Sequence, residues 1–311
     1  MALWKVIVKK GGNVNGMKLE AGMSVEVSTK STSDPIKYGD GMDAIADAFS
    51  SKYGFDSRKF RGINMQYQLE SKKEILSLQM SLNQQLSELY ASKFEGLNRI
   101  FSELQEQQID DYSWPLLLHV WEEEYNNAPI KLMVIGQETN GWNAPIDTCD
   151  DIEKSMESYK NFNLGKDYPN SNFWPWVYEI NRLLGNSDTN CFVWNNILKF
   201  GKECDNGRPV QDVTDRENNY FNVIANEINI LTPDVCLFLT GPYYDNDIKA
   251  KFDDAEFIEF DDYPIRKVAQ IKSKYLPEHS YRTYHPGYGN RYSEWYHKVF
   301  ESIVERINSN K

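Results

Sequence analysis

The chain has 311 residues, of which 41% are hydrophobic and 26% are charged, and its formal net charge at pH 7 is −12. This length suffices for one large domain or for two smaller domains with cores of their own. The acidic balance argues against a broad basic surface that binds any duplex, because phosphate binding depends on Lys and Arg, and it leaves room for a local DNA-binding cleft. The longest apolar runs are about five residues, so the sequence predicts no membrane span, no secretory signal and a cytoplasmic protein.

The first 70 residues predict a small β-rich module. We expect strands over 3–8 and 23–29, a short helix over 42–52 and a further strand over 62–69. The module contains no His, no Cys and no carboxylates paired at a useful spacing, and it carries 10 basic and 8 acidic side chains. We interpret residues 1–70 as a binding or oligomerisation module, or as a fused domain, with the chemistry elsewhere in the chain.

Residues 71–109 predict one long amphipathic helix. Apolar side chains recur there at steps of three and four residues between Ile75 and Leu104, which is the pattern of a helix with one buried face. Gly96 is a candidate bend in this helix. We expect the helix to pack on the adjacent domain. As an alternative it dimerises, so that residues 1–108 would bind a protein partner or a second copy of the chain.

Residues 110–311 predict an α/β domain, because short apolar strands alternate with helical stretches. We expect three layers around a central, mostly parallel, four-stranded sheet, with strands over 130–135, 191–194, 235–240 and 281–284. In open parallel sheets the carboxyl ends of the strands line the ligand crevice. The residues that follow these strands are therefore the candidate site: Gly136 to Gly141, Asn195 and Asn196, Gly241 and Pro242, and His285 to Gly287.

These strand ends offer one carboxylate, several amides and one imidazole. The chain has no nucleophile elbow with Ser or Cys and no Gly-Lys-Ser/Thr phosphate loop, so the sequence disfavours acyl transfer and nucleotide hydrolysis. The four cysteines form no Cys-x-x-Cys pair and the four histidines have no ligand-like spacing, which predicts neither a metal nor another cofactor. Free thiols are expected at Cys149, Cys191, Cys204 and Cys236. What remains is a site that activates water and binds a polar, planar ligand.

Four motifs in this order resemble the uracil-DNA glycosylase superfamily, over about residues 110–311. Gly136-Gln137-Glu138 is similar to the first motif of that family, which handles the attacking water. Tyr168 to Trp174 resembles the Asn-x-Phe-Trp stretch of the mismatch-specific branch. Phe192 to Asn195 resembles the strand that ends in the Asn that binds the uracil edge, and His285-Pro286-Gly287 resembles the His-Pro-Ser motif.

The resemblance implies a DNA glycosylase that flips a uracil or modified base out of the stack and hydrolyses its N-glycosidic bond without metal or cofactor. It implies that Glu138 orients the water or stabilises the sugar cation, and that His285 donates a hydrogen bond to the departing base. It also implies that Asn195 binds the pyrimidine edge, because an amide offers both a donor and an acceptor. The plainer alternatives are a solvated loop Glu, a His bonded to local backbone and a turn-forming Asn.

Other residues complete the site that this resemblance implies. The base-binding residues besides Asn195 are Gln137, Asn140, Phe162 and Tyr159, with Phe162 or Tyr159 as the stacking face. The residues expected to contact the DNA backbone or to enter the duplex as a wedge are Gly287, Tyr288 and Arg291. We interpret three further aromatic residues as core: Phe173, Trp174 and Trp176.

Two departures from the family pattern bear on the substrate. Glu138 replaces an Asp or Asn, and its extra methylene moves the carboxylate by about one bond length. Asn140 stands where uracil-specific members place a Tyr that excludes substituents at pyrimidine C5. We therefore hypothesise a 5-substituted pyrimidine as substrate, with defence against modified phage DNA as a candidate role. Two other functions stay open: a non-catalytic nucleotide or modified-base binder with this fold, and an acidic protein-interaction module.

Overall fold

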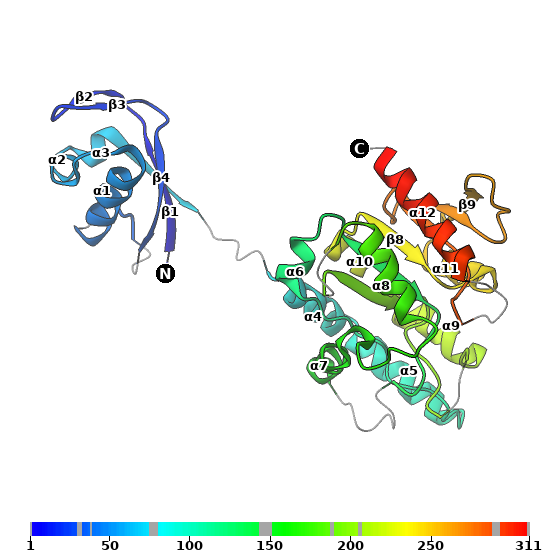
Figure 1. Cartoon of the computed structure of the whole chain (residues 1–311). Coiled ribbons are helices and arrows are strands. Elements are labelled where there is room, and N and C mark those ends of the chain that lie inside the picture. The colour runs from blue at the N-terminus through cyan, green and yellow to red at the C-terminus, as the bar shows by residue number, and fades with distance from the viewer. Residues whose placement is uncertain are drawn as a thin grey trace. The chain divides into compact units, whose positions relative to one another are not determined.

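The computed structural model describes residues 2–29, 33–37, 39–74, 80–142, 151–186, 190–204, 207–287 and 293–309. The chain forms two compact units, Met1–Met80 and Ser81–Lys311, and each unit has a buried core of its own. Figure 1 shows the elements of both units along the chain. Within the described ranges, no helix is long and apolar enough to cross a membrane.

The first unit consists of β1 (Ala2–Val8), β2 (Gly12–Val14), β3 (Met17–Leu19), β4 (Ser24–Thr29), α1 (Gly39–Tyr53), α2 (Ser57–Arg61), α3 (Met65–Gln68) and β5 (Leu69–Glu74). A three-stranded antiparallel sheet has the order β4-β1-β5, and β2 and β3 form a separate hairpin. Val6 and Val8 on β1 are buried, as expected for alternate residues of a strand with one buried face. The predicted strands over 3–8 and 23–29 and the predicted helix over 42–52 are confirmed.

The predicted strand over 62–69 is wrong, because this region follows the short helix α2 and contains the short helix α3. Asp56 caps α2, and its carboxylate accepts hydrogen bonds from the backbone N–H groups of Arg58 and Lys59. Asn64 caps α3 in the same way. Short polar side chains at an N-cap satisfy the unpaired N–H groups of a first helical turn and so favour a helix. The third strand of the sheet, β5, begins only at the end of this region.

The second unit begins with two helices, α4 (Leu82–Ser92) and α5 (Phe94–Glu106), rather than the long helix predicted over 71–109. A capping box starts α4: the Ser81 hydroxyl accepts from the Gln84 backbone N–H, and the Gln84 side chain accepts from the Ser81 N–H. The prediction of one continuous helix is wrong for two reasons. Strand β5 occupies its first residues, and the helix is interrupted at Lys93 rather than bent at Gly96.

Gly96 allows α5 to lie close to α9 (Gln211–Tyr220). A Cβ atom at Gly96 would lie 2.4 Å from the carbonyl oxygen of Tyr220. We expect Gly96→Ala to lower the free energy of unfolding by about 1–3 kcal/mol, because a clash with backbone outweighs the gain of ~1 kcal/mol in helix propensity. Urea unfolding measures the effect. Asn98→Ala, at an exposed position of the same helix, is the control; a Gly96→Ala midpoint equal to or above that of the parent would contradict the close approach.

The strands of the second unit are β6 (Leu132–Gly136), β7 (Phe192–Asn196), β8 (Val235–Phe238), β9 (Glu256–Glu259), β10 (Ala269–Lys272) and β11 (His279–Arg282). They form one sheet in the order β7-β6-β8-β11-β10-β9. The strands β7, β6, β8 and β11 are parallel to one another, whereas β10 pairs antiparallel with β11 and with the edge strand β9. The predicted α/β class and mostly parallel sheet are confirmed. The predicted number of four strands is wrong, because β9 and β10 were not predicted.

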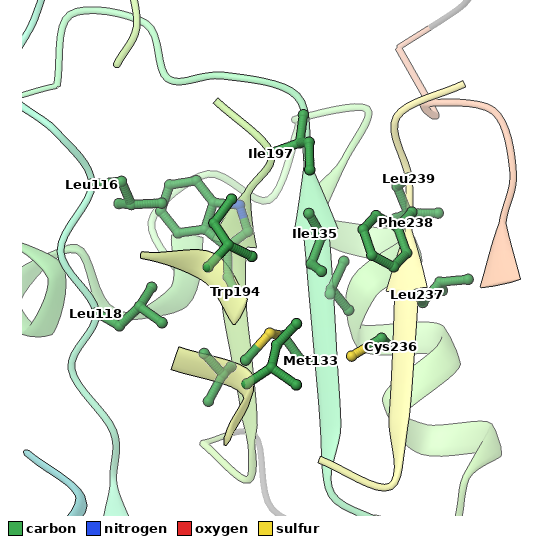
Figure 2. Packing of buried hydrophobic residues seen from close by; sticks show 14 of the residues in the cluster. Leu116, Leu118, Met133, Ile135, Trp194, Ile197, Cys236, Leu237, Phe238 and Leu239 are labelled. Atoms are coloured by element: carbon green, nitrogen blue, oxygen red, sulfur yellow. The ribbon is translucent and has the colours of Figure 1, made fainter. Parts of the chain in front are cut away.

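The strand β6, which pairs with β7 on one side and β8 on the other, is buried along its whole length. Figure 2 shows Met133 and Ile135 of β6 between Trp194 of β7 and the β8 residues Leu237 and Phe238. A parallel strand with neighbours on both sides and covered faces has a continuous apolar sequence, and this explains why β6 was predictable.

The remaining helices are α6 (Glu122–Asn126), α7 (Ile152–Phe162), α8 (Trp174–Leu183), α10 (Ile224–Leu231), α11 (Asp245–Lys251) and α12 (Ser293–Ser309), with the 3-10 turns η2 (Asn163–Gly165) and η3 (Pro242–Tyr244). Side chains on the two faces of β7 contact different helices. The Phe192 ring lies 5.6 Å from Tyr178 of α8, whereas Asn195 forms a hydrogen bond of 2.8 Å to Glu227 of α10. Successive side chains of a strand point to opposite faces. Asn196 therefore shares the α8 side of β7 with Phe192.

Candidate active site

A cavity of about 340 Å³ lies at the carboxyl ends of β6 and β7. Its polar lining consists of Gln137, Glu138, Thr139, Asn140, Ser171, Asn196 and His285, and its aromatic lining of Trp142, Phe162, Tyr168, Phe173, Trp174 and Trp194. A larger cavity of about 620 Å³ lies beside β10, lined mainly by charged and polar residues, and contains none of these side chains. The smaller cavity is the candidate site, because it combines a carboxyl group, an imidazole and aromatic surfaces at the edge where parallel sheets bind ligands.

Gly136, the last residue of β6, allows the backbone to approach the cavity closely. A Cβ atom here would lie 2.5 Å from Oδ1 of Asn196 and 3.5 Å from Cζ of Phe173. Only a residue without a side chain leaves Asn196 its present position. The Gly of the first motif is therefore explained by packing around the candidate site.

Glu138 is half-buried and lies two residues after β6. Its Oε2 atom accepts a hydrogen bond of 2.5 Å from the hydroxyl of Tyr244. Burial raises the pKa of the Glu138 carboxyl group above its ordinary value, and the Tyr244 hydrogen bond and the Arg208 charge oppose this rise. Arg208 in turn donates two hydrogen bonds, of 2.5 and 2.7 Å, to Asp247. A cavity carboxyl group with a raised pKa is suited to accept a proton during a reaction.

His285 follows β11 and stacks on Phe173, with ring centroids 5.3 Å apart and planes inclined by 15°. Burial lowers the pKa of His285 to about 4, so that the imidazole is neutral near pH 7. Its Nδ1 atom accepts a hydrogen bond of 3.0 Å from the backbone N–H of Gly287. A neutral imidazole that accepts at Nδ1 carries its proton on Nε2. His285 thus presents a neutral donor, which can stabilise a developing anion.

The structure does not bring Asn195 to the cavity. This side chain is fully buried: its Nδ2 donates to Glu227 at 2.8 Å, and its Oδ1 accepts from the ammonium group of Lys199 at 2.7 Å. Asn196 lines the cavity instead, and its buried Nδ2 atom forms no hydrogen bond with any residue that the structure describes. The candidate base-binding amide is therefore Asn196 rather than Asn195. Strand alternation, which places the two side chains on opposite faces, is the reason for this correction.

Of the two rings proposed as stacking face, the structure places Phe162 in the cavity and Tyr159 outside its lining. The Tyr159 hydroxyl donates to the backbone carbonyl of Trp194 at 2.8 Å and accepts from its N–H at 2.9 Å. Tyr159 therefore fixes the position of Trp194. Phe162 has its ring 5.4 Å from Trp142 and 5.3 Å from Trp194, and so belongs to a continuous aromatic surface.

Two residues that were interpreted as core, Phe173 and Trp174, also line the cavity. They lie at the N-terminus of α8, where Ser171 accepts hydrogen bonds from both backbone N–H groups. Trp176, one half-turn further on, packs on Tyr296 of α12 at 5.0 Å and lies outside the cavity lining. The segment from Tyr168 to Trp176 thus contributes side chains both to the cavity lining and to the core.

The other expected site residues take different positions. Gln137 and Asn140 line the cavity, and the Gln137 side chain donates to the carbonyl of Thr240 at 2.7 Å. Gly287 lies outside the cavity lining and contacts the ring of His285. Tyr288 and Arg291 lie outside the described residues.

Tyr244, Arg208 and Asp247 were not predicted from the sequence. They come from η3, from the segment before α9 and from α11, and they meet at Glu138 only in the folded chain. Their one sequence signal is that Tyr244 follows the predicted strand end Gly241-Pro242. Across the residues that the structure describes, no group of three or more His, Cys, Asp or Glu side chains could hold a metal ion.

Comparison with known protein families gives a match that covers most of the first unit. Residues 1–68 are similar to a protein family of unknown function, DUF6140. No curated protein matches the chain. The matched residues end before the second unit and include none of the residues that line the candidate site.

Proposed function

We propose that the second unit is a DNA glycosylase that hydrolyses the N-glycosidic bond of a modified pyrimidine in DNA. The observation that carries the proposal is that the Glu138 carboxyl group and the His285 imidazole line one aromatic cavity. Hydrolysis of this bond needs a proton acceptor for water, a donor for the departing base and a surface that holds the flipped base. The mostly parallel sheet with its helices also supports the proposal, because it is the class of fold that the sequence predicts for this unit.

In the proposed reaction, the bond between C1′ and the base nitrogen breaks and its electron pair leaves with the base. His285 donates the hydrogen bond of its Nε2–H group to the base oxygen that gains negative charge. Glu138 orients a water molecule and accepts its proton while the water oxygen forms a bond to C1′. This proton then passes to the base, so that nucleotide and water yield a free base and an abasic sugar.

The size of the cavity supports a base larger than uracil. Its volume of about 340 Å³ falls in the range of about 300–1,000 Å³ that holds drug-sized ligands, which are larger than an unsubstituted pyrimidine. Asn140 lies exposed among the lining residues, at the position where uracil-specific glycosylases have an excluding Tyr. We therefore propose a 5-substituted pyrimidine as substrate.

The deciding experiment offers the protein single- and double-stranded oligonucleotides that carry uracil, thymine or 5-substituted cytosines and uracils. Alkaline cleavage then reveals abasic sites. Cleavage of the 5-substituted oligonucleotides by the parent, but not by His285→Ala, would support the proposal. Binding without abasic sites would favour a non-catalytic base binder, and a salt-insensitive protein complex without DNA affinity would favour a protein-interaction module.

Asn196→Ala is expected to lower kcat/KM by about tenfold to a hundredfold, because one hydrogen bond to the base edge is lost. Steady-state kinetics of abasic-site formation measure this. Asn195→Ala should act differently: it removes a partner of the buried Lys199 and so lowers the midpoint of unfolding. Equal losses of kcat/KM without loss of stability in both variants would contradict this assignment of the two neighbouring amides.

A further inference from the structure

We propose that Tyr244 and the Arg208–Asp247 ion pair are positioning residues for Glu138: the tyrosine hydroxyl fixes the carboxyl group in the cavity, and the ion pair sets the charge that this group faces. The inference rests on the proposed function, because positioning has a chemical consequence only if Glu138 handles water. None of the three residues lines the cavity, so they would act through Glu138 and not on the substrate.

The hydrogen bond between Tyr244 and Glu138 holds one of the two carboxyl oxygens. The distance of 2.5 Å from the Tyr244 hydroxyl to Oε2 is that of a bond between a hydroxyl donor and a charged acceptor. Tyr244 is itself almost buried, in a short turn between β8 and α11. With Oε2 held in this way, Oε1 is the carboxyl oxygen that remains to orient water.

Arg208 and Asp247 form a bidentate pair beside this bond. Asp247 is buried and its two oxygens accept from the two terminal nitrogens of Arg208, at 2.5 and 2.7 Å. The guanidinium carbon lies 5.8 Å from the centre of the Tyr244 ring. The negative charge of Asp247 therefore offsets the positive charge of Arg208, which would otherwise stabilise the ionised Glu138 carboxylate more strongly.

The charged and titratable groups that face Glu138 come from four elements. Tyr244 belongs to η3, Asp247 to α11 and Arg208 to the segment before α9, and all three contribute to the electrostatics of the Glu138 carboxyl group. His285, after β11, lines the same cavity and is neutral near pH 7. Tyr244 contacts Glu138, Arg208 lies beside the Tyr244 ring and Asp247 pairs with Arg208, so a change in any of the three alters the surroundings of Glu138.

This arrangement predicts opposite effects of two isosteric substitutions on the titration of Glu138. Tyr244→Phe removes a hydrogen bond to the carboxylate, so the pKa of Glu138 should rise. Asp247→Asn removes a negative charge and leaves Arg208 unopposed, so this pKa should fall. In the proposed reaction the acidic limb of the pH–kcat profile should move upward in the first variant and downward in the second. Tyr244→Phe should also lower kcat by about tenfold to a hundredfold, through misplacement, with a smaller change in KM.

The experiment combines this pH profile with a carbon-13 NMR titration of the glutamate carboxyl groups in the full chain. The Glu138 signal is the one that disappears in Glu138→Gln. Matched controls are Tyr243→Phe, at a 70% exposed neighbour of Tyr244, and Asp253→Asn, at an exposed position. Both controls should leave the titration of Glu138 unchanged.

The NMR titration separates this inference from the proposed function, because it needs no substrate. Opposite shifts with base release support both. Opposite shifts without base release on any oligonucleotide would leave the positioning of Glu138 in place and refute the glycosylase. Shifts in the same direction, or no shift in either variant, would overturn the inference whatever the activity.

Discussion

Glu138→Gln is expected to slow base release strongly and, at the same time, to stabilise the folded protein near neutral pH. Gln has the size of Glu and still accepts the hydrogen bond from Tyr244 through its amide oxygen, but it cannot accept a proton from water. Removal of a general base costs about 10²–10⁴ in rate. We expect kcat for abasic-site formation to fall within this range, while the affinity for the modified oligonucleotide is retained.

The expected gain in stability follows from the direction of the pKa shift. Burial raises the pKa of Glu138 in the folded state. The folded protein therefore holds a proton more tightly at this site than the unfolded chain does, and its stability falls as pH rises from the unfolded to the folded pKa. Above this window the buried carboxylate costs stability, and a neutral Gln avoids the cost. Glu138→Gln should thus raise the thermal midpoint relative to the parent at about pH 8, and less or not at all at about pH 4.

Thermal unfolding of both proteins at the two pH values measures this difference. Glu294→Gln, which removes an exposed carboxylate on α12, is the control and should change neither kcat nor the midpoint. A stabilised protein that retains full activity would exclude Glu138 as the proton acceptor. An inactive protein that is destabilised at both pH values would show that Glu138 supports the fold.

The sequence predicts two of the parallel strands well because they are short apolar runs that are buried on both faces. β6 and β8 are of this kind. The strands β9 and β10 escape such reasoning, because Glu256–Glu259 and Ala269–Lys272 each mix charged or polar residues with apolar ones over only four positions. So short a mixed segment is also typical of loops. Likewise, the apolar periodicity of residues 82–106 does not show that one helix ends and the next begins at Lys93.

The candidate site was predictable in part. The end of β6 gave Gln137, Glu138 and Asn140, all of which line the cavity. The choice between Asn195 and Asn196 was not predictable, because β7 is buried throughout and such a strand carries no polar alternation that reveals its faces. Tyr244 was not predictable either, because its contact with Glu138 joins residues 106 positions apart in the chain.

Breaking the buried ion pair on the face of β7 opposite the cavity should strongly destabilise the second unit. Lys199 and Glu227 are fully buried, and their charged groups lie 2.7 Å apart. The Glu227 carboxylate also accepts from the Tyr90 hydroxyl at 2.6 Å and from Asn195 at 2.8 Å. These bonds tie α4, α10 and the end of β7 together at the face opposite the cavity, so that the position of Asn196 depends on them through its neighbour.

Glu227→Gln is expected to lower the free energy of unfolding by about 3–5 kcal/mol, because it removes the ion-pair partner of the fully buried Lys199 ammonium group. Lys199→Met should be comparably destabilising, since it isolates the carboxylate. The double variant should lose less than the sum of the two, because it contains neither isolated charge. Urea unfolding of the four proteins gives the coupling energy. Strictly additive losses would show that the two side chains do not act as a pair.

The pH dependence of the stability of Glu227→Gln shows whether its loss of stability comes from the buried Lys199 charge or from lost packing. Burial lowers the pKa of Lys199 below its ordinary value of 10.5, and Glu227 opposes this shift. Without Glu227 the folded state holds the Lys199 proton still less tightly, whereas the unfolded chain retains it up to the ordinary value. The unfolded state therefore binds more protons in this window, and stability rises with pH. The deficit of Glu227→Gln relative to the parent should shrink as pH rises toward the ordinary lysine pKa of about 10, whereas a deficit caused by packing alone would stay constant.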